Sequence, residues 1–440
     1  MGYPIVPARR KARAVLGLLL CLAAPRSFAQ EAARDRGDYL TLKIAVMGPG
    51  DELYFWWGHI ALIIEDGLSG QSRFYDYGLF SFENEHFFVN FAFGRLLYSC
   101  GASPTDRNIA AYRQTNRDVT IYTLDLPAPV KENIRALAEK DVLPENRNYY
   151  YHHFRDNCST RIRDLLDAGL DGQLQAAWGN APGRFTLRQH VRRHTWFSPF
   201  FDWILNFWMG QGIDAPITVW DEMFLPQEVG RRIEDFYYTD HYREPPEGQT
   251  GRLKKLVSQV ETLNRAVDRP PVLAAPRNQW SRHLGLGLGI AGLCWLFHGI
   301  RRKRDRIGRL CLGVIQSCLG LFFGAAGSVL CFMILFTNHD YTYHNSNLLY
   351  VNPLLLAALP LGIRMIQKNR AEGRRAERLL GFLWLLVFLG GLISMAVKVL
   401  PWFYQQNQAT QALVLPFALS LGIIPLLSRR EAPRPPMATT

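Results

Sequence analysis

Residues 149–167 read YYYHHFRDNCSTRIRDLLD and carry the strongest local signal in the 440-residue chain. The apolar positions 162, 165 and 166 recur at helical spacing, and Asp156 or Asn157 directly before them is a suitable helix N-cap. Cys158 is therefore predicted in the first helical turn. Backbone N–H groups and the helix dipole favour a thiolate there, and the same N–H groups can receive an oxyanion. The stretch predicts a helix that begins with a cysteine nucleophile.

A thiolate nucleophile needs a proton partner, and His59 is the candidate. It follows Gly58 within an apolar run, 56–64, that is predicted to be a strand. The next predicted strand, 72–82, carries Tyr75 and Asp76. We expect Asp76 to bond the far ring nitrogen of His59 and to fix its tautomer. Cys158, His59 and Asp76 would then form a nucleophile, a base and an orienting group.

Other interpretations of the same residues remain open. A lone cysteine is often a buried structural residue, and a histidine on an apolar strand is often part of the core. Cys100 and Cys158 could form a disulfide in an oxidising compartment, which would remove the nucleophile. A metal site from His152, His153, Asp156 and Cys158 is also conceivable, but adjacent histidines point in different directions on most backbones. We therefore predict no metal.

The N-terminus has the pattern of a secretory signal. Basic residues at 9–13 precede an apolar run, 15–24, and Ser27-Phe28-Ala29 ends in a small residue. We predict a signal peptide over 1–29 that is cut near Ala29, with an uncleaved signal anchor as the alternative. Either form places the following domain across the membrane.

The last part of the chain is predicted to be a membrane domain, over 281–428, with a cytoplasmic tail at 429–440. Its apolar runs are long enough to span about 30 Å of hydrocarbon. Basic residues are concentrated in the segments 301–309, 364–378 and 429–434, whereas the alternate connections, 337–347 and 401–410, carry a single charged residue, Asp340. This asymmetry predicts that the basic segments lie in the cytoplasm. The five predicted spans are 283–300, 310–336, 348–363, 379–400 and 411–428.

The composition limits the class of protein further. Hydrophobic residues make up 48% of the chain, which excludes a disordered protein, and the net charge of +12 lies mostly in the membrane half. A nucleic-acid partner is therefore not needed to explain the charge.

Between 30 and 280, short strand-like and helical segments follow one another, as is typical of an α+β domain. The predicted strands are 41–47, 56–64, 72–82 and 119–126, and the predicted helices are 129–143 and 158–168.

Two further segments suit contact with lipid. The aromatic stretch 196–209 is too short and too polar to span a bilayer, and it is predicted to lie in the lipid interface or to be a core helix. The external connection before the third span is rich in polar residues, which are costly at membrane depth and often functional. His339, Asn345 and Asn347 are therefore candidate lipid or substrate contacts, with an ordinary solvated loop as the alternative.

The order of these elements resembles a known group of proteins. A strand histidine, a polar residue on the next strand and Asn-Cys at the start of a helix are similar to the circularly permuted papain-like (NlpC-type) proteins. More narrowly, the chain resembles the Lnb-type lipoprotein N-acyltransferases, in which a periplasmic domain precedes a helical membrane domain. The segments that carry this resemblance are Trp57–Leu62, Tyr75–Gly78, Tyr150–Arg163 and Trp220–Pro226. Asp76 departs from the pattern, because the family often has Asn at that position.

The resemblance implies a fold and a reaction. The fold would be a permuted papain-like domain over 30–280, followed by about five membrane helices. The enzyme would move an acyl chain from a phospholipid, through a thioester on Cys158, to the α-amine of the S-diacylglyceryl cysteine of a lipoprotein. No cofactor is implied. Asn157, Tyr151 and Tyr75 would support the site, and the protein would lie in the bacterial inner membrane with its catalytic domain in the periplasm.

Two other functions fit the same residues. A cell-wall peptidase or amidase would use the same cysteine and histidine with water as the acceptor, although soluble glycan strands do not require a membrane domain. A membrane-tethered binding module would keep Cys158 as a structural residue. The acceptor of the acyl group and the reactivity of Cys158 distinguish these functions.

Overall fold

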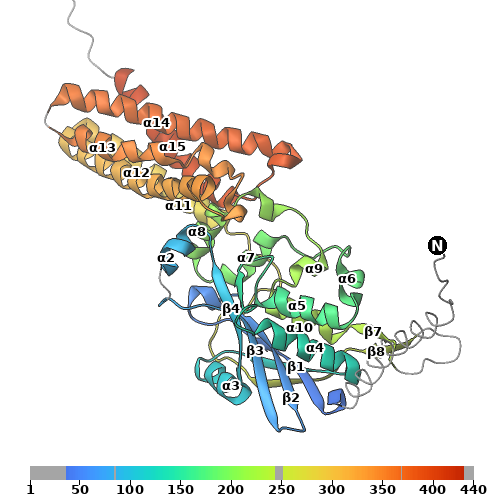
Figure 1. Cartoon of the computed structure of the whole chain (residues 1–440). Helices are drawn as coiled ribbons and strands as arrows, with labels where there is room; N and C mark the ends of the chain where they lie inside the picture. The colour runs from blue at the N-terminus through green and yellow to red at the C-terminus, as the bar shows by residue number, and fades with distance from the viewer. Residues whose placement is uncertain (1–35, 84–85, 243–250, 368, 431–440) are drawn as a thin grey trace, which may run out of the picture. The chain divides into compact units, whose positions relative to one another are not determined.

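The computed structural model describes residues 36–83, 86–242, 251–367 and 369–430 (Figure 1). The predicted signal segment and most of the predicted cytoplasmic tail lie outside these residues. The described residues form two compact units. Among the described residues, the first unit comprises 36–83, 96–184 and 218–269, and the second comprises 86–95, 185–217 and 270–430. The segments 86–95 and 185–217 thus belong to the second unit, although they precede the membrane domain predicted from hydropathy.

A seven-stranded antiparallel sheet forms the centre of the first unit, with the strand order β6-β4-β3-β2-β1-β5-β9. Helices cover both of its faces (Figure 1). The unit also contains short helices and a two-stranded sheet, β7-β8. The α+β class predicted from the sequence is therefore confirmed. The strands are β1 (Leu40–Met47), β2 (His59–Asp66), β3 (Gln71–Leu79), β4 (Leu97–Pro104), β5 (Val119–Leu124), β6 (Asn148–Tyr150), β7 (Tyr237–Asp240), β8 (Arg252–Lys255) and β9 (Val257–Asn264). The helices are η1 (Leu53–Phe55), α3 (Thr105–Gln114), α4 (Ala128–Asp141), α5 (Cys158–Gly169), α6 (Gln173–Trp178), α9 (Val219–Glu222) and α10 (Pro226–Glu234).

Alternation along the strands divides the core of this unit into two layers. On one face, alternate residues of β1 and β2 such as Ile44 and Leu62 pack with α4 and with Ile162 of α5. On the other face, Ala61 and neighbouring residues pack with Ile109 of α3. The helix that begins with Cys158 is thus fixed against the sheet by the apolar stripe that its sequence shows.

The second unit contains five segments that are long and apolar enough to cross a membrane. They overlap the five runs predicted from hydropathy, so the helical membrane domain is confirmed. They are α11 (Trp280–Lys303), α12 (Asp305–Phe336), the segment Ser346–Ile366, α14 (Arg370–Ala396), which continues through η6 (Val397–Val399), and α15 (Gln408–Arg430). The other elements are α2 (Phe87–Ala92), α7 (Leu187–Thr195), α8 (Pro199–Trp208), η2 (Gln211–Asp214), η3 (Asp340–Thr342) and η7 (Pro401–Phe403).

The third of these segments is not a continuous α-helix. It consists of two 3-10 turns, η4 (Ser346–Leu349) and η5 (Pro353–Ala357), followed by the short α13 (Ala358–Ile366). Glycines of α12 allow it to pack closely, because a Cβ on Gly324 would stand 2.6 Å from the backbone nitrogen of Leu356. Irregular backbone at membrane depth is tolerated where protein surrounds it.

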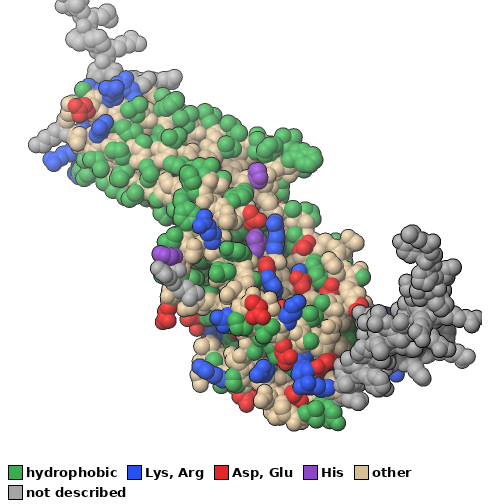
Figure 2. All heavy atoms as spheres, in the orientation of Figure 1, with side chains coloured by type: hydrophobic (Ala, Val, Ile, Leu, Met, Phe, Trp, Pro, Cys, Tyr) green, Lys and Arg blue, Asp and Glu red, His purple; other side chains and the backbone are tan. Residues whose placement is uncertain are grey.

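Charge and hydrophobicity are separated within the helical unit. Apolar side chains cover its visible surface, whereas Lys and Arg gather at one end (Figure 2). Arg301, at the end of α11, donates to Glu377 near the start of α14 at 3.0 Å, so two of the basic segments meet at the same end. This arrangement is the one expected for a bundle that obeys the positive-inside rule.

Candidate active site

The N-terminus of α5 is held by an N-cap and a capping box. The side-chain oxygen of Asn157 accepts hydrogen bonds from the backbone nitrogens of Ser159 and Thr160, at 2.8 and 3.0 Å. In return, Thr160 Oγ1 accepts from the backbone nitrogen of Asn157 at 2.8 Å. These bonds satisfy donors that a helix start otherwise leaves unpaired. Cys158 is therefore the first residue of a rigid helix, at the end where the dipole favours negative charge.

A second segment, Trp220–Pro226, fixes this helix start from outside. Asn157 Nδ2 donates to the carbonyl oxygen of Phe224 at 3.0 Å and to that of His153 at 2.7 Å. One turn further along α5, the guanidinium of Arg163 lies 3.9 Å from the ring centroid of Trp220 and donates to its carbonyl oxygen at 2.8 Å. The segment thus positions the nucleophile through backbone carbonyls and one cation–π contact.

The same segment reaches the loop before His59. A Cβ on Gly58 would lie 3.6 Å from Pro226 Cγ, and Gly58 has a φ of +79°, which favours glycine. The turn at Gly58 delays the start of the strand, so β2 begins at His59 itself rather than at position 56. His59 and the start of α5 therefore both adjoin the segment Trp220–Pro226.

His59 and Asp76 are joined by a short hydrogen bond. His59 Nε2 lies 2.6 Å from Asp76 Oδ1, and both side chains are largely buried. The strand register explains the pairing, because Ala61 of β2 stands opposite Asp76 of β3 and His59 lies two residues away on the same face. With Nε2 engaged by Asp76, Nδ1 is the ring nitrogen left for proton transfer. Within the described residues, Nδ1 has no hydrogen-bond partner.

The surroundings of His59 favour its protonated form. Burial by itself would lower the pKa, but the Tyr112 hydroxyl, the Asp76 carboxylate and the charge on Cys158 together raise the pKa of His59 well above 6.5. Because Cys158 contributes to this shift, the two side chains lie within electrostatic reach of each other. An imidazole near a cysteine at a helix N-terminus is the arrangement of an activated nucleophile.

Tyr112 and Arg117 extend the site in a way that the sequence did not indicate. The ring of Tyr112, on α3, stacks on His59 with centroids 6.3 Å apart. The guanidinium of Arg117 lies 4.9 Å from the Tyr112 ring and 4.7 Å from that of Phe55, and its Nε donates to the carbonyl oxygen of Gly48 at 2.9 Å. These residues hold the imidazole plane against the sheet. A single tyrosine in an ordinary amphipathic helix gives no sequence signal for this role.

Gly78 lies close to Cys158 and to two tyrosines. Gly78 has a φ of +87°, and a Cβ there would stand 3.8 Å from Cys158 Cβ, 3.6 Å from Tyr151 Cε2 and 3.9 Å from the hydroxyl of Tyr149. The Tyr149 hydroxyl is buried and has no hydrogen-bond partner among the described residues. Sequence reasoning selected Tyr151 but missed Tyr149. A buried phenolic donor next to a nucleophile can stabilise negative charge that develops on a reacting carbonyl.

Tyr75 lies on the face of the sheet opposite to Asp76, in the core cluster that also contains Cys158. Tyr75 is adjacent to Asp76 on β3, so its side chain points to the opposite face of the sheet. There it is 1% exposed and packs in the core with Ile60 and Leu62. Tyr75 therefore stays a predicted supporting residue, now at a core position on the face of the sheet that α5 covers.

The two cysteines of the first unit are not joined. Cys100 and Cys158 are both free thiols, and Cys100 Sγ donates to the carbonyl oxygen of Asp141 at 3.1 Å. Burial, with a contribution from Asp141, raises the pKa of Cys100 to about 11. Cys100 is thus a thiol at neutral pH, and the disulfide alternative is not realised in this structure.

The residues of the metal alternative make other contacts. His152 Nδ1 accepts hydrogen bonds from the backbone nitrogens of Phe154 and Arg155, both at 3.1 Å. Asp156 forms an ion pair with Arg161, whose Nη2 donates to it at 2.8 Å. In the part of the chain that the structure describes, no three His, Cys, Asp or Glu side chains are grouped as metal ligands.

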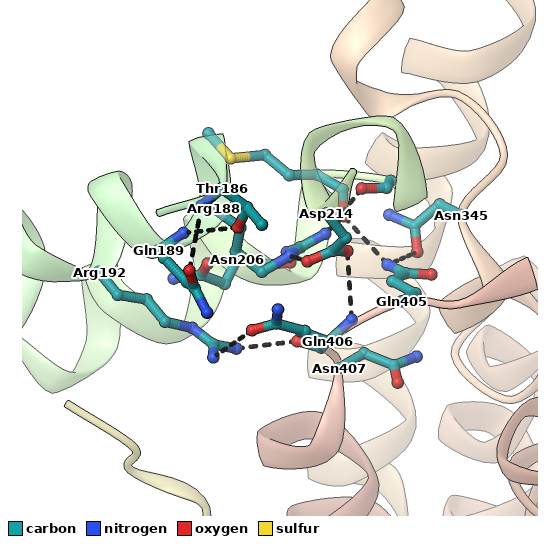
Figure 3. A network of polar contacts seen from close by, with 12 residues as sticks. Thr186, Arg188, Gln189, Arg192, Asn206, Asp214, Asn345, Gln405, Gln406 and Asn407 are labelled. Atoms are coloured by element: carbon teal, nitrogen blue, oxygen red, sulfur yellow. Dashed lines mark hydrogen bonds and ion pairs between the residues drawn. The ribbon is translucent and has the colours of Figure 1, made fainter. Parts of the chain in front are cut away.

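The three candidate lipid contacts lie in the second unit and are buried. His339 Nε2 lies 3.0 Å from the carbonyl oxygen of Phe91. The amide nitrogens of Asn345 and Asn347 both donate to the carbonyl oxygen of Phe207, at 2.8 and 2.9 Å. Figure 3 shows Asn345 within a wider polar network that includes Gln405 and Asp214. These side chains are packed within the second unit instead of forming a solvated loop.

Taken together, the fold and the site define a membrane protein whose α+β domain holds a cysteine at a helix N-terminus beside a His–Asp pair. A model of the Lnb N-terminal periplasmic domain matches residues 29–193, and a model of the Lnb transmembrane domain matches residues 288–430. Because both domains match in this order and cover most of the chain, the chain belongs to the Lnb-type lipoprotein N-acyltransferase family. No curated protein and no solved structure matched the chain.

Proposed function

We propose that this protein is a lipoprotein N-acyltransferase that carries the acyl chain as a thioester on Cys158. The observation that carries the proposal is the arrangement of a capped helix start at Cys158 with the His59–Asp76 pair, bonded at 2.6 Å. Membership of the Lnb family supports the choice of an acyl group and of a lipoprotein acceptor. The domain names also support a bacterial inner-membrane protein with the catalytic domain in the periplasm.

In the first half of the reaction, the Cys158 thiolate attacks the ester carbonyl carbon of a phospholipid. The carbonyl oxygen becomes an oxyanion, which the backbone N–H of Cys158 and the Tyr149 hydroxyl would stabilise. The ester C–O bond then breaks. His59 Nδ1 gives its proton to the departing alkoxide, which leaves as the alcohol of a lysophospholipid, and the acyl group remains on sulfur.

In the second half, the α-amine of the lipoprotein's S-diacylglyceryl cysteine attacks the thioester. His59 Nδ1 takes a proton from the attacking nitrogen, the C–S bond breaks, and the thiolate is regenerated together with an amide. The hydrogen bond between Asp76 and Nε2 holds the ring and would direct Nδ1 toward the sulfur. A thioester suits this task because it yields to an amine under mild conditions.

A transfer assay with the full-length protein tests the proposal. The protein is incubated with phospholipid and a diacylated lipopeptide, and the peptide is analysed by mass spectrometry. We expect a gain of one acyl group on the peptide amine, and we expect Cys158→Ser and His59→Ala to abolish it while both variants still accumulate in the membrane. Cleavage of the peptide, with no acyl gain, would instead identify the cell-wall hydrolase. Unchanged transfer by Cys158→Ser would reject the mechanism.

A further inference from the structure

The second unit contains a small polar cavity that the proposed reaction does not use. It has a volume of about 10 Å³, the space in which the centre of one water-sized group can move. Its walls come from α7, α8, the N-cap of α11 and the start of α15. Some of the lining residues are buried, whereas Asn278 and Gln408 are exposed and mark the mouth of the cavity. A ligand group can therefore enter from one side.

Three buried amide oxygens in this cavity have no partner among the described residues. They are the side-chain oxygens of Asn206, Gln279 and Asn407, each from a residue that is at least nine-tenths buried. Leaving a buried acceptor unpaired costs free energy, so three in one small cavity require an explanation.

The orientation of each amide is fixed by its nitrogen. Asn206 Nδ2 donates to the carbonyl oxygen of Asp202 at 2.6 Å, and Gln279 Nε2 donates to that of Trp196 at 3.3 Å. Asn407 Nδ2 donates to Asn347 Oδ1 at 2.8 Å. Each nitrogen thus faces an acceptor, and a flipped amide would place two oxygens together. The three free acceptors are therefore a property of the fold.

Two charged side chains line the same cavity. Asp202 is 5% exposed, and burial raises its pKa, although Thr195 Oγ1 donates to it at 2.6 Å. Arg192 donates to the carbonyl oxygen of Gln406 at 2.8 Å, and the residue is labelled beside Gln406 and Asn407 in Figure 3. Arg192 and Asp202 each shift the pKa of the other, so they lie within electrostatic reach of each other. The cavity is therefore lined by one carboxyl group and one guanidinium group.

We propose that this cavity binds the ethanolamine head group of a phospholipid. The ammonium group has the size of a water molecule and supplies three N–H donors, one for each amide oxygen, beside the carboxylate of Asp202. One water molecule donates only two hydrogen bonds and brings no charge. The buried indole N–H of Trp203 also lines the cavity and lacks a partner. The phosphate of the head group can accept a hydrogen bond from this indole N–H and can neutralise the charge of Arg192. A free ammonium ion offers neither interaction.

Native mass spectrometry of the full-length protein in detergent tests this proposal. The protein is offered an equal mixture of phosphatidylethanolamine, phosphatidylcholine and phosphatidylglycerol with identical short acyl chains. The choline lipid is a matched control, because methylation removes every N–H donor and leaves the phosphate unchanged. We expect the ethanolamine lipid to be retained about tenfold more than either of the others, since hydrogen bonds between charged and polar groups contribute at least that factor.

Variants connect the preference to the cavity. We expect Gln279→Met and Asn206→Leu each to reduce the preference for the ethanolamine lipid about fivefold or more, because each removes one acceptor with little change in volume. Gln367→Met, at an exposed position between α13 and α14, should leave it unchanged. Equal retention of the three lipids by the unmodified protein would overturn the proposal and would leave the cavity as a water site. Full preference in both variants would also overturn it. The assay measures binding alone, so its outcome does not depend on the catalytic role of Cys158.

Discussion

Replacing Asp76 by Asn tests how the carboxylate controls His59. The hydrogen bond between His59 Nε2 and Asp76 Oδ1 is 2.6 Å long, and the two side chains are 15% and 12% exposed. A hydrogen bond to a charged group contributes about 1.5–3 kcal/mol, and one between neutral groups contributes about 1 kcal/mol. An Asn side chain keeps an acceptor oxygen at this place and loses the charge. The substitution should therefore cost about 1.4 kcal/mol of transition-state stabilisation, which is a tenfold decrease in kcat/KM.

The pH profile reveals the cause of this decrease. Asp76 is one of the groups that raise the pKa of His59, so its loss lowers that pKa. The alkaline limb of the kcat/KM profile, where the imidazolium is lost, should move to lower pH in Asp76→Asn. Acyl transfer to a lipopeptide is measured between pH 5 and about pH 10 for the unmodified protein, Asp76→Asn and the control Asp106→Asn, at an exposed position on α3. An alkaline limb that stays in place in Asp76→Asn, or an equal change in both variants, would refute the role of Asp76.

Three further outcomes are expected. Tyr149→Phe removes a buried hydroxyl beside Cys158 and should lower kcat about 100-fold with little change in KM; an unchanged kcat excludes the Tyr149 hydroxyl as an oxyanion donor. Asn157→Ala removes the N-cap and two hydrogen bonds to backbone carbonyls and should reduce the free energy of unfolding by about 3 kcal/mol, whereas Asn157→Ser, which keeps a capping oxygen, should lose less in the same thermal denaturation assay. The pKa of His59 is raised in the folded state, so protonation of His59 stabilises the folded protein. This stabilisation is complete below pH 6.5 and is lost as the pH rises through the folded-state pKa. The difference in Tm between the unmodified protein and Asp76→Asn should therefore be largest at acidic pH. A constant difference across that range would show that His59 does not titrate in the folded protein.

The parts of the fold that the sequence predicted are those set by local pattern. α5 begins at Cys158 as expected, because Asn157 supplies the cap and the apolar stripe follows it directly. The pairing of His59 with Asp76 was also predictable, since consecutive strands joined by a short turn usually pair. The five apolar segments follow from hydropathy alone.

The parts that sequence reasoning missed depend on contacts between distant residues. Tyr112 reaches His59 only because α3 packs on that face of the sheet, and Tyr149 reaches Cys158 through the pairing of β6 with β4. Nothing in the sequence marks Tyr112, and Tyr149 stands in a row of three tyrosines that the sequence alone cannot rank. The break in the third membrane segment did have a signal, because Asn352-Pro353 is a typical turn dipeptide, but hydropathy averages over it.

The intact mass of the full-length protein, measured after exposure to phospholipid in the absence of a lipoprotein acceptor, tests the central claim most directly. We predict that the protein gains the mass of one acyl chain, that peptide mapping places it on Cys158, and that hydroxylamine at neutral pH removes it as expected for a thioester. The adduct should then disappear on addition of a diacylated lipopeptide, and it should be absent from Cys158→Ala. A protein that gains no mass, or an adduct that persists in Cys158→Ala, would contradict the account.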